Sequence, residues 1–220
     1  MSSIGSNLQV AMFTVGPLQE NCYLLTDHVS GSAVLVDPGD EAESLLEAVA
    51  DSGCALAAIW LTHAHFDHIG AVAAIVRHSD VPVLLHPLDL PLYENASASA
   101  LRFGLTVETP PSRTTPLAEG DVVRCGSEEF TVWHVPGHAP GHVAFISNGL
   151  CISGDVLFAG SIGRTDLPLC DARAMQRSLE RLSTLPPETQ VLSGHGPVTT
   201  IAREAANNPF LRGMARPVGA

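Results

Sequence analysis

Hydrophobic and polar positions alternate in three short segments near the N-terminus, Leu8–Val15, Asn21–Thr26 and Ala33–Val36. Such alternation between turn-forming residues is typical of short antiparallel strands. The turn Asp37–Asp40 breaks the pattern, and Ser44–Asp51 then has the apolar spacing of an amphipathic helix. The first quarter of the chain therefore predicts strands followed by a helix.

The same kind of pattern continues to the end of the chain. It predicts, in order, a buried strand at Ala55–Leu61, a helix at Gly70–His78, strands at Val81–Leu85, Val122–Arg124, Phe130–Val135, Val143–Ser147 and Leu150–Ser153, a helix after the N-cap Asp171, a strand at Gln190–Leu192 and a helix at Ile201–Ala206. The intervening Asp89–Pro116 is rich in Pro, Ser, Ala and Asn, and we expect an irregular insertion there with one helix around Ala98–Phe103.

The order of elements indicates two similar halves of mixed α and β structure. Such halves bury their apolar faces when two sheets pack face to face with helices outside. The 220 residues, 45% of them hydrophobic, suffice for one well-filled core. No repeat or linker separates the halves, so we predict one domain over residues 1–220.

Charge and cysteine content narrow the functional class. The chain has 23 acidic against 11 basic residues, all of the latter arginine, and a net charge of −12. This balance argues against binding to a nucleic-acid backbone. The five cysteines are scattered and form no C-x-x-C motif, which is typical of buried free thiols in a reducing compartment.

Neither an export signal nor a membrane span is expected. The N-terminal residues lack a basic region followed by an apolar one, and no stretch approaches the roughly 20 apolar residues that a transmembrane helix needs. We therefore expect a soluble cytoplasmic protein with no membrane partner; the sequence leaves its oligomeric state open.

The segment Thr62–His68, which reads T-H-A-H-F-D-H, concentrates four metal-competent side chains directly after a predicted buried strand. His63 and His65 lie two residues apart, so on extended backbone they project to the same side and can bind one ion. Asp67 and His68, beyond the bend, can face a second ion.

Three later segments contain further candidate ligands. His138 in P-G-H, Asp155 in S-G-D and His195 in S-G-H-G each follow a predicted strand, next to a glycine that permits tight backbone. The ends of neighbouring strands can meet at one edge of the sheets. The sequence therefore predicts a polynuclear His/Asp metal site.

The order H-x-H-x-D-H, P-G-H, G-D and G-H-G resembles the metallo-β-lactamase superfamily over nearly the whole chain. The segments Pro136–His142, Gly154–Phe158, Gly163–Asp166 and Gly194–Pro197 are similar to its glyoxalase II-like hydrolase branch. The resemblance implies an α/β (α+β) fold, a four-layer αββα sandwich. It implies that His63, His65 and His138 hold one metal, that Asp67, His68 and His195 hold the other, and that Asp155 bridges them. It also gives Asp67 and Asp155 a catalytic role. Asp37 would support the ligand segment Thr62–His68, called the metal loop below, without binding a metal itself.

Some histidines compete with this set. His142 lies four residues after His138 and is a rival ligand, although the family pattern favours His138. The others, His28, His78, His86 and His134, match no ligand position, and we expect surface or packing roles for them.

The donor set suits two Zn²⁺ ions, with iron or manganese as alternatives. Such a pair can hold a bridging hydroxide that attacks a polarised carbonyl. A thiolate leaving group has a pKa of about 8.5 and departs without a proton, whereas an amide nitrogen needs a donor. The sequence thus favours a hydrolase of small-molecule thioesters or activated esters, and the resemblance points to a glutathione conjugate such as S-D-lactoylglutathione.

The chain departs from glyoxalase II after His195, where only residues 196–220 follow and the helical glutathione-binding extension is largely missing. Arg164 in G-R-T-D is a candidate for gripping a substrate carboxylate, with Asp166 orienting it; the alternative is a local ion pair that stabilises the loop.

Other functions remain open at this stage. A glutathione persulfide dioxygenase with a single iron shares the fold and most ligands, but has a different segment in place of Ser193–Pro197. A β-lactamase would need export. A metal-binding scaffold without activity is disfavoured because all seven ligand positions are intact.

Overall fold

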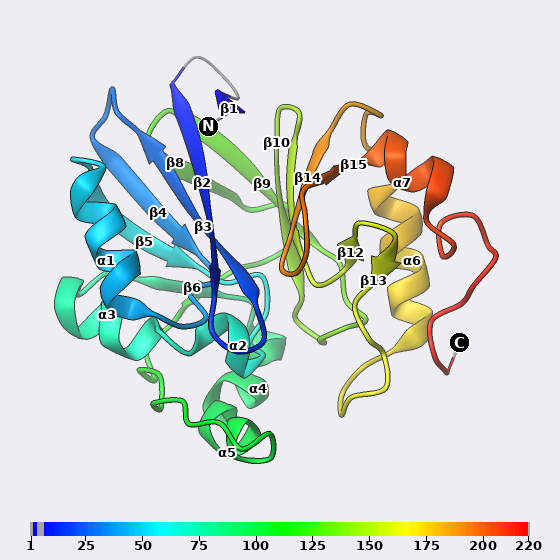
Figure 1. Ribbon diagram of the computed structural model, residues 1–220, viewed down its shortest axis with the longest axis horizontal. Helices are drawn as coiled ribbons and strands as arrows, with labels where there is room; N and C mark the ends of the chain where they lie inside the picture. The colour runs from blue at the N-terminus through cyan, green and yellow to red at the C-terminus, as the bar shows by residue number, and fades with distance from the viewer. Residues whose placement is uncertain (1, 4–6, 220) are drawn as a thin grey trace.

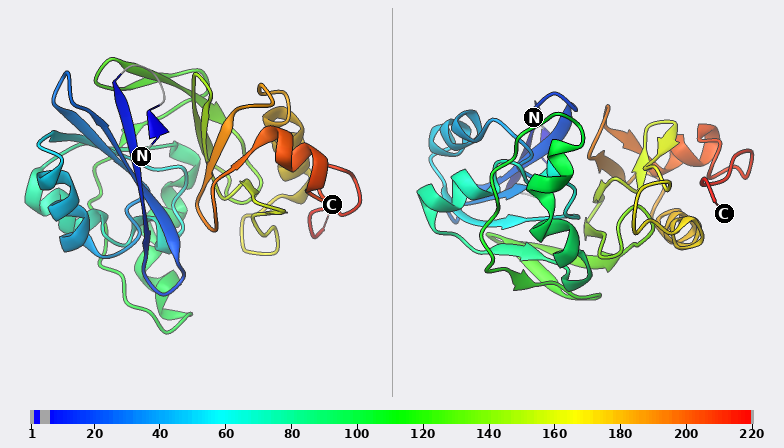
Figure 2. Two further views of the ribbon diagram at one scale, coloured as in Figure 1. Left: turned by 45° about the horizontal axis from the view of Figure 1, so that its top comes forward. Right: turned by 90° about the horizontal axis from the view of Figure 1, so that it is seen from below.

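The computed structural model describes residues 2–3 and 7–219; Met1, residues 4–6 and Ala220 of the predicted domain lie outside this range. Two β-sheets stand side by side with helices on their outer faces (Figures 1 and 2). No helix in the described part of the chain is both long and apolar enough to cross a bilayer. All five cysteines are free; four are buried as the sequence predicts, whereas Cys170 is partly exposed.

The first sheet has seven strands in sequential order, antiparallel as far as β4 and parallel from β4 to β7. These are β1 (Ser2–Ser3), β2 (Leu8–Val15), β3 (Glu20–Asp27), β4 (Ser32–Val36), β5 (Ala55–Trp60), β6 (Val83–Leu85) and β7 (Thr115–Pro116). Every residue of β3 is buried, because this strand lies between β2 and β4 with both of its faces covered.

The second sheet has six strands in the order β15-β14-β11-β10-β9-β8, with only β11 and β14 parallel. They are β8 (Val122–Cys125), β9 (Glu128–His134), β10 (Val143–Ser147), β11 (Leu150–Gly154), β14 (Gln190–Ser193) and β15 (Thr199–Thr200). A small hairpin, β12 (Leu157–Phe158) with β13 (Ser161–Ile162), follows β11. The strands predicted in this half all form; Val143–Ser147 has the predicted bounds, and the ends of the others differ by no more than two residues.

The two sheets share an apolar core. Trp60 of the first sheet contacts Phe130 and Phe145 of the second, with ring centroids 5.3 and 5.1 Å apart. The outer face of the first sheet is covered by α1 (Ala42–Asp51) and α3 (Val72–Ser79), and that of the second by α6 (Ala172–Leu182) and α7 (Ile201–Asn207). This confirms the predicted four-layer αββα sandwich.

Helix α6 begins where the sequence predicts. The side chain of Asp171 accepts hydrogen bonds from the backbone N–H groups of Arg173 and Ala174, which would otherwise lack partners in the first turn. Met175 and Leu179 then face the second sheet and are fully buried.

The insertion differs from the expectation. The helix predicted around Ala98–Phe103 forms two residues earlier, as α5 (Ala96–Leu101), and it is preceded by two elements that were not predicted, the 3₁₀ turn η1 (Pro87–Asp89) and the short helix α4 (Leu90–Glu94). Helix α4 was not predicted because proline usually interrupts a helix. Pro91, however, lies in the first turn of α4, where the missing backbone N–H would have no partner in the helix. The helix predicted at Gly70–His78 forms as α3, and a further short helix, α2 (Phe66–Ile69), precedes it in the segment where the sequence predicted only a polar cluster.

Candidate metal centre

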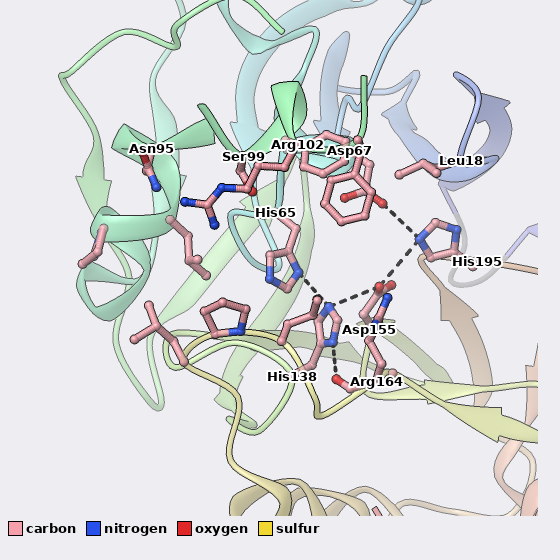
Figure 3. Close-up of a pocket in the computed structure, with 18 of the residues that line it drawn as sticks. Leu18, His65, Asp67, Asn95, Ser99, Arg102, His138, Asp155, Arg164 and His195 are labelled. Atoms are coloured by element: carbon pink, nitrogen blue, oxygen red, sulfur yellow. Dashed lines mark hydrogen bonds and ion pairs between the residues drawn. The ribbon is translucent and has the colours of Figure 1, made fainter. Parts of the chain in front are cut away.

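The candidate ligands lie on loops that follow β5, β9, β11 and β14, where these strands end. The segment Thr62–His68 connects β5 to α2, with His65 at the N-cap of α2 in extended conformation. His138, Asp155 and His195 follow β9, β11 and β14 respectively. The strand ends therefore bring together the residues that the sequence singled out, as Figure 3 shows for five of them.

His63, His65 and His138 form one group, with one ring nitrogen of each within 4.8 Å of the others. Nδ1 of His65 lies 2.8 Å from Nε2 of His138. The other nitrogen of His138, Nδ1, lies 2.8 Å from the backbone carbonyl of Arg164. A proton on Nδ1 that binds this carbonyl leaves the Nε2 lone pair free to face the group.

Asp67, His68 and His195 form a second group within the same limit. Oδ2 of Asp67 lies 3.4 Å from Nε2 of His195 and 4.0 Å from Nε2 of His68. The far nitrogen of His195 lies 3.3 Å from the carbonyl of Gln19, which turns its Nε2 toward the centre.

Asp155 lies between the two groups. Its Oδ1 is 3.4 Å from Nε2 of His68, while its Oδ2 is 3.4 Å from Nε2 of His138 and 3.6 Å from Nε2 of His195. One carboxylate thus faces histidines of both groups (Figure 3). This is the position expected of a ligand shared between two ions.

The centre contains buried polar atoms that lack any hydrogen-bond partner among the described residues. Nε2 of His63, Nε2 of His68 and Oδ1 of Asp155 are such atoms. Buried polar atoms without partners are costly, and three of them in one place fit a site built to bind cations. The donors are imidazole nitrogens and carboxylate oxygens without thiolate, which suits zinc, iron or manganese.

The electrostatics of the centre also suit metal binding. Burial lowers the pKa of His63 and His138, and lowers that of His65 to about 3, so these rings are neutral and their lone pairs are available. Burial alone would raise the pKa of Asp155, but His68 and the neighbouring histidines hold it well below its usual range. The carboxylate is therefore ionised.

Asp37 supports the metal loop as the sequence predicts. Its Oδ1 accepts the backbone N–H of Thr62 at 2.7 Å, and its Oδ2 accepts the Thr62 hydroxyl at 2.6 Å. The same Oδ2 lies 3.1 Å from Nδ1 of His68. Asp37, His63 and His68 form a third group of the right spacing, but both Asp37 oxygens are already engaged by Thr62.

The rival ligand His142 has a different environment. Its Nε2 accepts the backbone N–H of Asp155 at 3.0 Å, and its ring stacks on that of His63 with centroids 4.7 Å apart. His142 belongs to none of the three groups of metal-ligating spacing in the described chain, and neither do His28, His78, His86 or His134. The rings of His86 and His134 stack on each other, a packing role.

Two buried carboxyl groups beside the centre were missed by the sequence reasoning. Glu20 lies 3.6 Å from Nδ1 of His68, and burial raises its pKa. Asp89 accepts the N–H of Ala64 at 3.0 Å and that of Gly141 at 2.5 Å. It therefore ties the metal loop to the loop of His138, even though burial raises its pKa to about 6.

We expect Asp89→Asn to lower metal affinity about 10- to 100-fold, the usual range for groups that hold ligands in place. The asparagine oxygen can accept only one of the two backbone N–H groups, and the asparagine NH₂ group would face the other. One of the two loops therefore loses its hydrogen bond to residue 89. Titration with zinc against a competing chelator measures the change. Asp121→Asn is the matched control, because Asp121 accepts the N–H of Ala118 on the exposed surface. Equal affinity of the two variants would contradict the prediction.

Arg164 lines the cavity in front of the centre, but its guanidinium is engaged. Nε and Nη2 bind the two carboxylate oxygens of Asp166 at 2.7 and 2.9 Å, and both side chains are about half-exposed. This is the local ion pair that the sequence left as the alternative to carboxylate binding. The part of Arg164 that reaches the centre is its carbonyl, behind His138.

A four-layer αββα sandwich with a His/Asp centre at its strand ends defines a class of metal-binding proteins. The family model of the metallo-beta-lactamase superfamily matches residues 15–195, and the chain belongs to this superfamily.

Three relatives illustrate its range. Hydroxyacylglutathione hydrolase GloC of Haemophilus influenzae is 34% identical over 209 residues, which cover 93% of this chain and 98% of that protein. The crystal structure of TTHA1623 in a di-iron-bound form is 53% identical, with a TM-score of 0.86 over 92% of this chain and 100% of the other. The crystal structure of BLEG-1 B3 metallo-beta-lactamase is 38% identical, with a TM-score of 0.86 over 92% and 99%.

Proposed function

We propose that the protein is a metal-dependent hydrolase of thioesters or activated esters, with seven ligands arranged around two metal ions. The observation that supports this most directly is the position of Asp155 between the two histidine groups. Two metal ions held by these residues would supply an activated water and a Lewis acid for a carbonyl oxygen. Zinc or iron suits the donors, and the di-iron form of TTHA1623 favours testing both.

The residues of the site have separate roles in the proposed reaction. His63, His65 and His138 are held neutral by burial and keep their lone pairs toward the centre. Asp155 stays ionised and offsets positive charge on both sides. Phe66 and Phe158 line the cavity beside Asp67 and His195 and make its wall apolar next to these ligands.

The leaving group decides between esters and amides. Apart from the ligand cluster, the titratable side chains that line the cavity within the described chain are two arginines, which do not donate protons at neutral pH. A thiolate leaves without a proton, whereas an amine needs one. The site therefore suits thioesters, S-D-lactoylglutathione among them, better than amides or β-lactams.

We expect the metal-loaded protein to hydrolyse a thioester at least about 100-fold faster, in kcat/KM, than a cephalosporin, because general-acid assistance of that size is what amide cleavage lacks here. Chelation should abolish the activity, and zinc, iron and manganese added back separately identify the metal that restores it. Circular dichroism before and after chelation controls for unfolding. A cephalosporin turned over as well as a thioester would overturn the assignment.

The strongest alternative is the single-iron persulfide dioxygenase. Consumption of oxygen with glutathione persulfide, together with one iron per chain, would replace the hydrolase proposal. Two metal ions per chain, with no oxygen uptake, would support the hydrolase proposal.

A further inference from the structure

The cavity in front of the metal centre has a volume of about 770 Å³ and is lined mainly by apolar side chains. This is the size of a typical small-molecule site. Its apolar wall includes Phe66, Leu92, Phe103, Phe158, Ile162 and Leu167. Phe103 is 54% exposed at the rim and contacts the ring of Phe66, with centroids 5.3 Å apart. Such a wall favours a ligand with an apolar portion of its own.

A short polar row interrupts this wall. Asn95, Ser99 and Arg102 are spaced four and three residues apart along α5 and its ends, so they lie on one helical face. All three line the cavity, and Figure 3 shows them on the same side of it as His65. The neighbouring face of the helix carries Ala96 and Ala100, which are buried in the core. The orientation of the row is therefore fixed by packing.

Arg102 is the cation of this cavity that is free to bind a ligand. The cavity contains two guanidiniums, and that of Arg164 is neutralised by Asp166. Within the residues that the structure describes, Arg102 forms no ion pair. A guanidinium binds a carboxylate through two parallel hydrogen bonds, and Asn95 and Ser99 offer further donors beside it.

The charge of the chain limits how many anionic groups a substrate can carry. The net charge of the chain is −12, and Arg102 is the cation of the cavity that has no carboxylate partner among the described residues. One unpaired arginine in this acidic surrounding favours a single carboxylate over several. The apolar wall lies in the same cavity as Arg102 and the metal ligands.

We propose that Arg102 binds the carboxylate of the substrate, and that the substrate class is thioesters with an apolar portion and one carboxylate. This rests on the hydrolase function proposed above. The proposal gives the insertion of residues 89–116 a role in selecting the substrate. It also assigns the anion-binding role to Arg102 rather than to Arg164, for which the sequence left carboxylate binding and a local ion pair as alternatives.

The test compares two thioesters of the same apolar acid, such as phenylacetic acid. One has 3-mercaptopropionate as its thiol, which carries a carboxylate, and the other has N-acetylcysteamine, which is neutral. We expect Arg102→Gln to lower kcat/KM for the anionic thioester about 10- to 100-fold, the effect of losing a hydrogen bond between charged partners. The neutral thioester should change less than about twofold. Arg164→Gln is the matched control within the cavity and should leave the ratio of the two unchanged.

Equal losses for both substrates in Arg102→Gln, or an anion-specific loss in Arg164→Gln, would overturn the proposal. S-D-lactoylglutathione turned over faster than both phenylacetyl thioesters would overturn the substrate class. The corresponding thioethers, which cannot be hydrolysed, separate this proposal from the function on which it rests. If no thioester is hydrolysed, calorimetric binding of the anionic thioether that is weakened by Arg102→Gln still supports the anion site, and binding that is unaffected rejects it.

Discussion

Asp155→Asn should leave the protein folded and remove its hydrolase activity, with kcat/KM reduced more than about 100-fold. That figure is the upper end of what losing a group behind a ligand costs, and Asp155 faces the histidines of both groups directly. The amide keeps the shape of the carboxylate but not its charge, so the attraction for cations on both sides falls together. Metal content should therefore drop at both positions rather than at one.

The measurement is metal content per chain by plasma emission spectroscopy, alongside thioester kinetics. Asp51→Asn, an exposed carboxylate at the end of α1, is the control for loss of one charge. Thermal melting of the metal-free proteins separates loss of metal from loss of fold. An Asp155→Asn protein that binds two ions and keeps full activity would show that Asp155 is not shared between them.

The strands and the ligand cluster could be predicted from the sequence because their signals are local. Alternation identifies β2 within its observed bounds, and the H-x-H-x-D-H segment places four side chains in six positions. Glycine beside each later ligand was also informative. At Gly194, a Cβ atom would collide with the Asp155 carboxylate, so only glycine allows the loop to approach.

The supporting residues could not be predicted, because their partners are distant in the chain. Asp89 lies 25 residues from Ala64 and 52 from Gly141, and no motif surrounds it. Glu20 is part of a buried strand, and nothing near it in the sequence explains a charged residue there. The structure shows that it lies beside His68, 3.6 Å from Nδ1. Such contacts depend on how the sheets meet, which alternation does not encode.

The two arginines show the same limit. Arg164 attracted attention because it lies in a motif near Asp155, yet the carboxylate two residues later binds it. Arg102 lies in the helix that the sequence predicts around Ala98–Phe103, but only the observed position of α5 shows that it shares a face with Asn95 and Ser99 and lines the cavity. Both arginines line the cavity, but proximity in sequence does not show which of them is free of a carboxylate partner.

His138→Ala should abolish turnover and lose one metal ion, whereas His142→Ala should keep most of the metal. Nε2 of His138 is within 2.8 Å of His65 and 3.4 Å of Asp155, so its removal leaves one group with two histidines. His142 instead stacks on His63 and accepts the Asp155 N–H, so its removal leaves a cavity and an unpaired donor. We expect a lower melting temperature for His142→Ala, with metal affinity reduced no more than about 10-fold, as for a group behind the ligands.

Metal content, melting temperature and thioester kinetics of both variants, measured side by side, decide between the two histidines. His142→Asn is the informative third variant, because its amide oxygen can still accept the N–H of Asp155 and should recover part of the lost stability. The same amide at position 138 has no such backbone donor to satisfy, since Nδ1 of His138 faces the carbonyl of Arg164. If His142→Ala loses an ion and activity while His138→Ala retains both, the ligand is His142 and the arrangement around Asp155 must be redrawn.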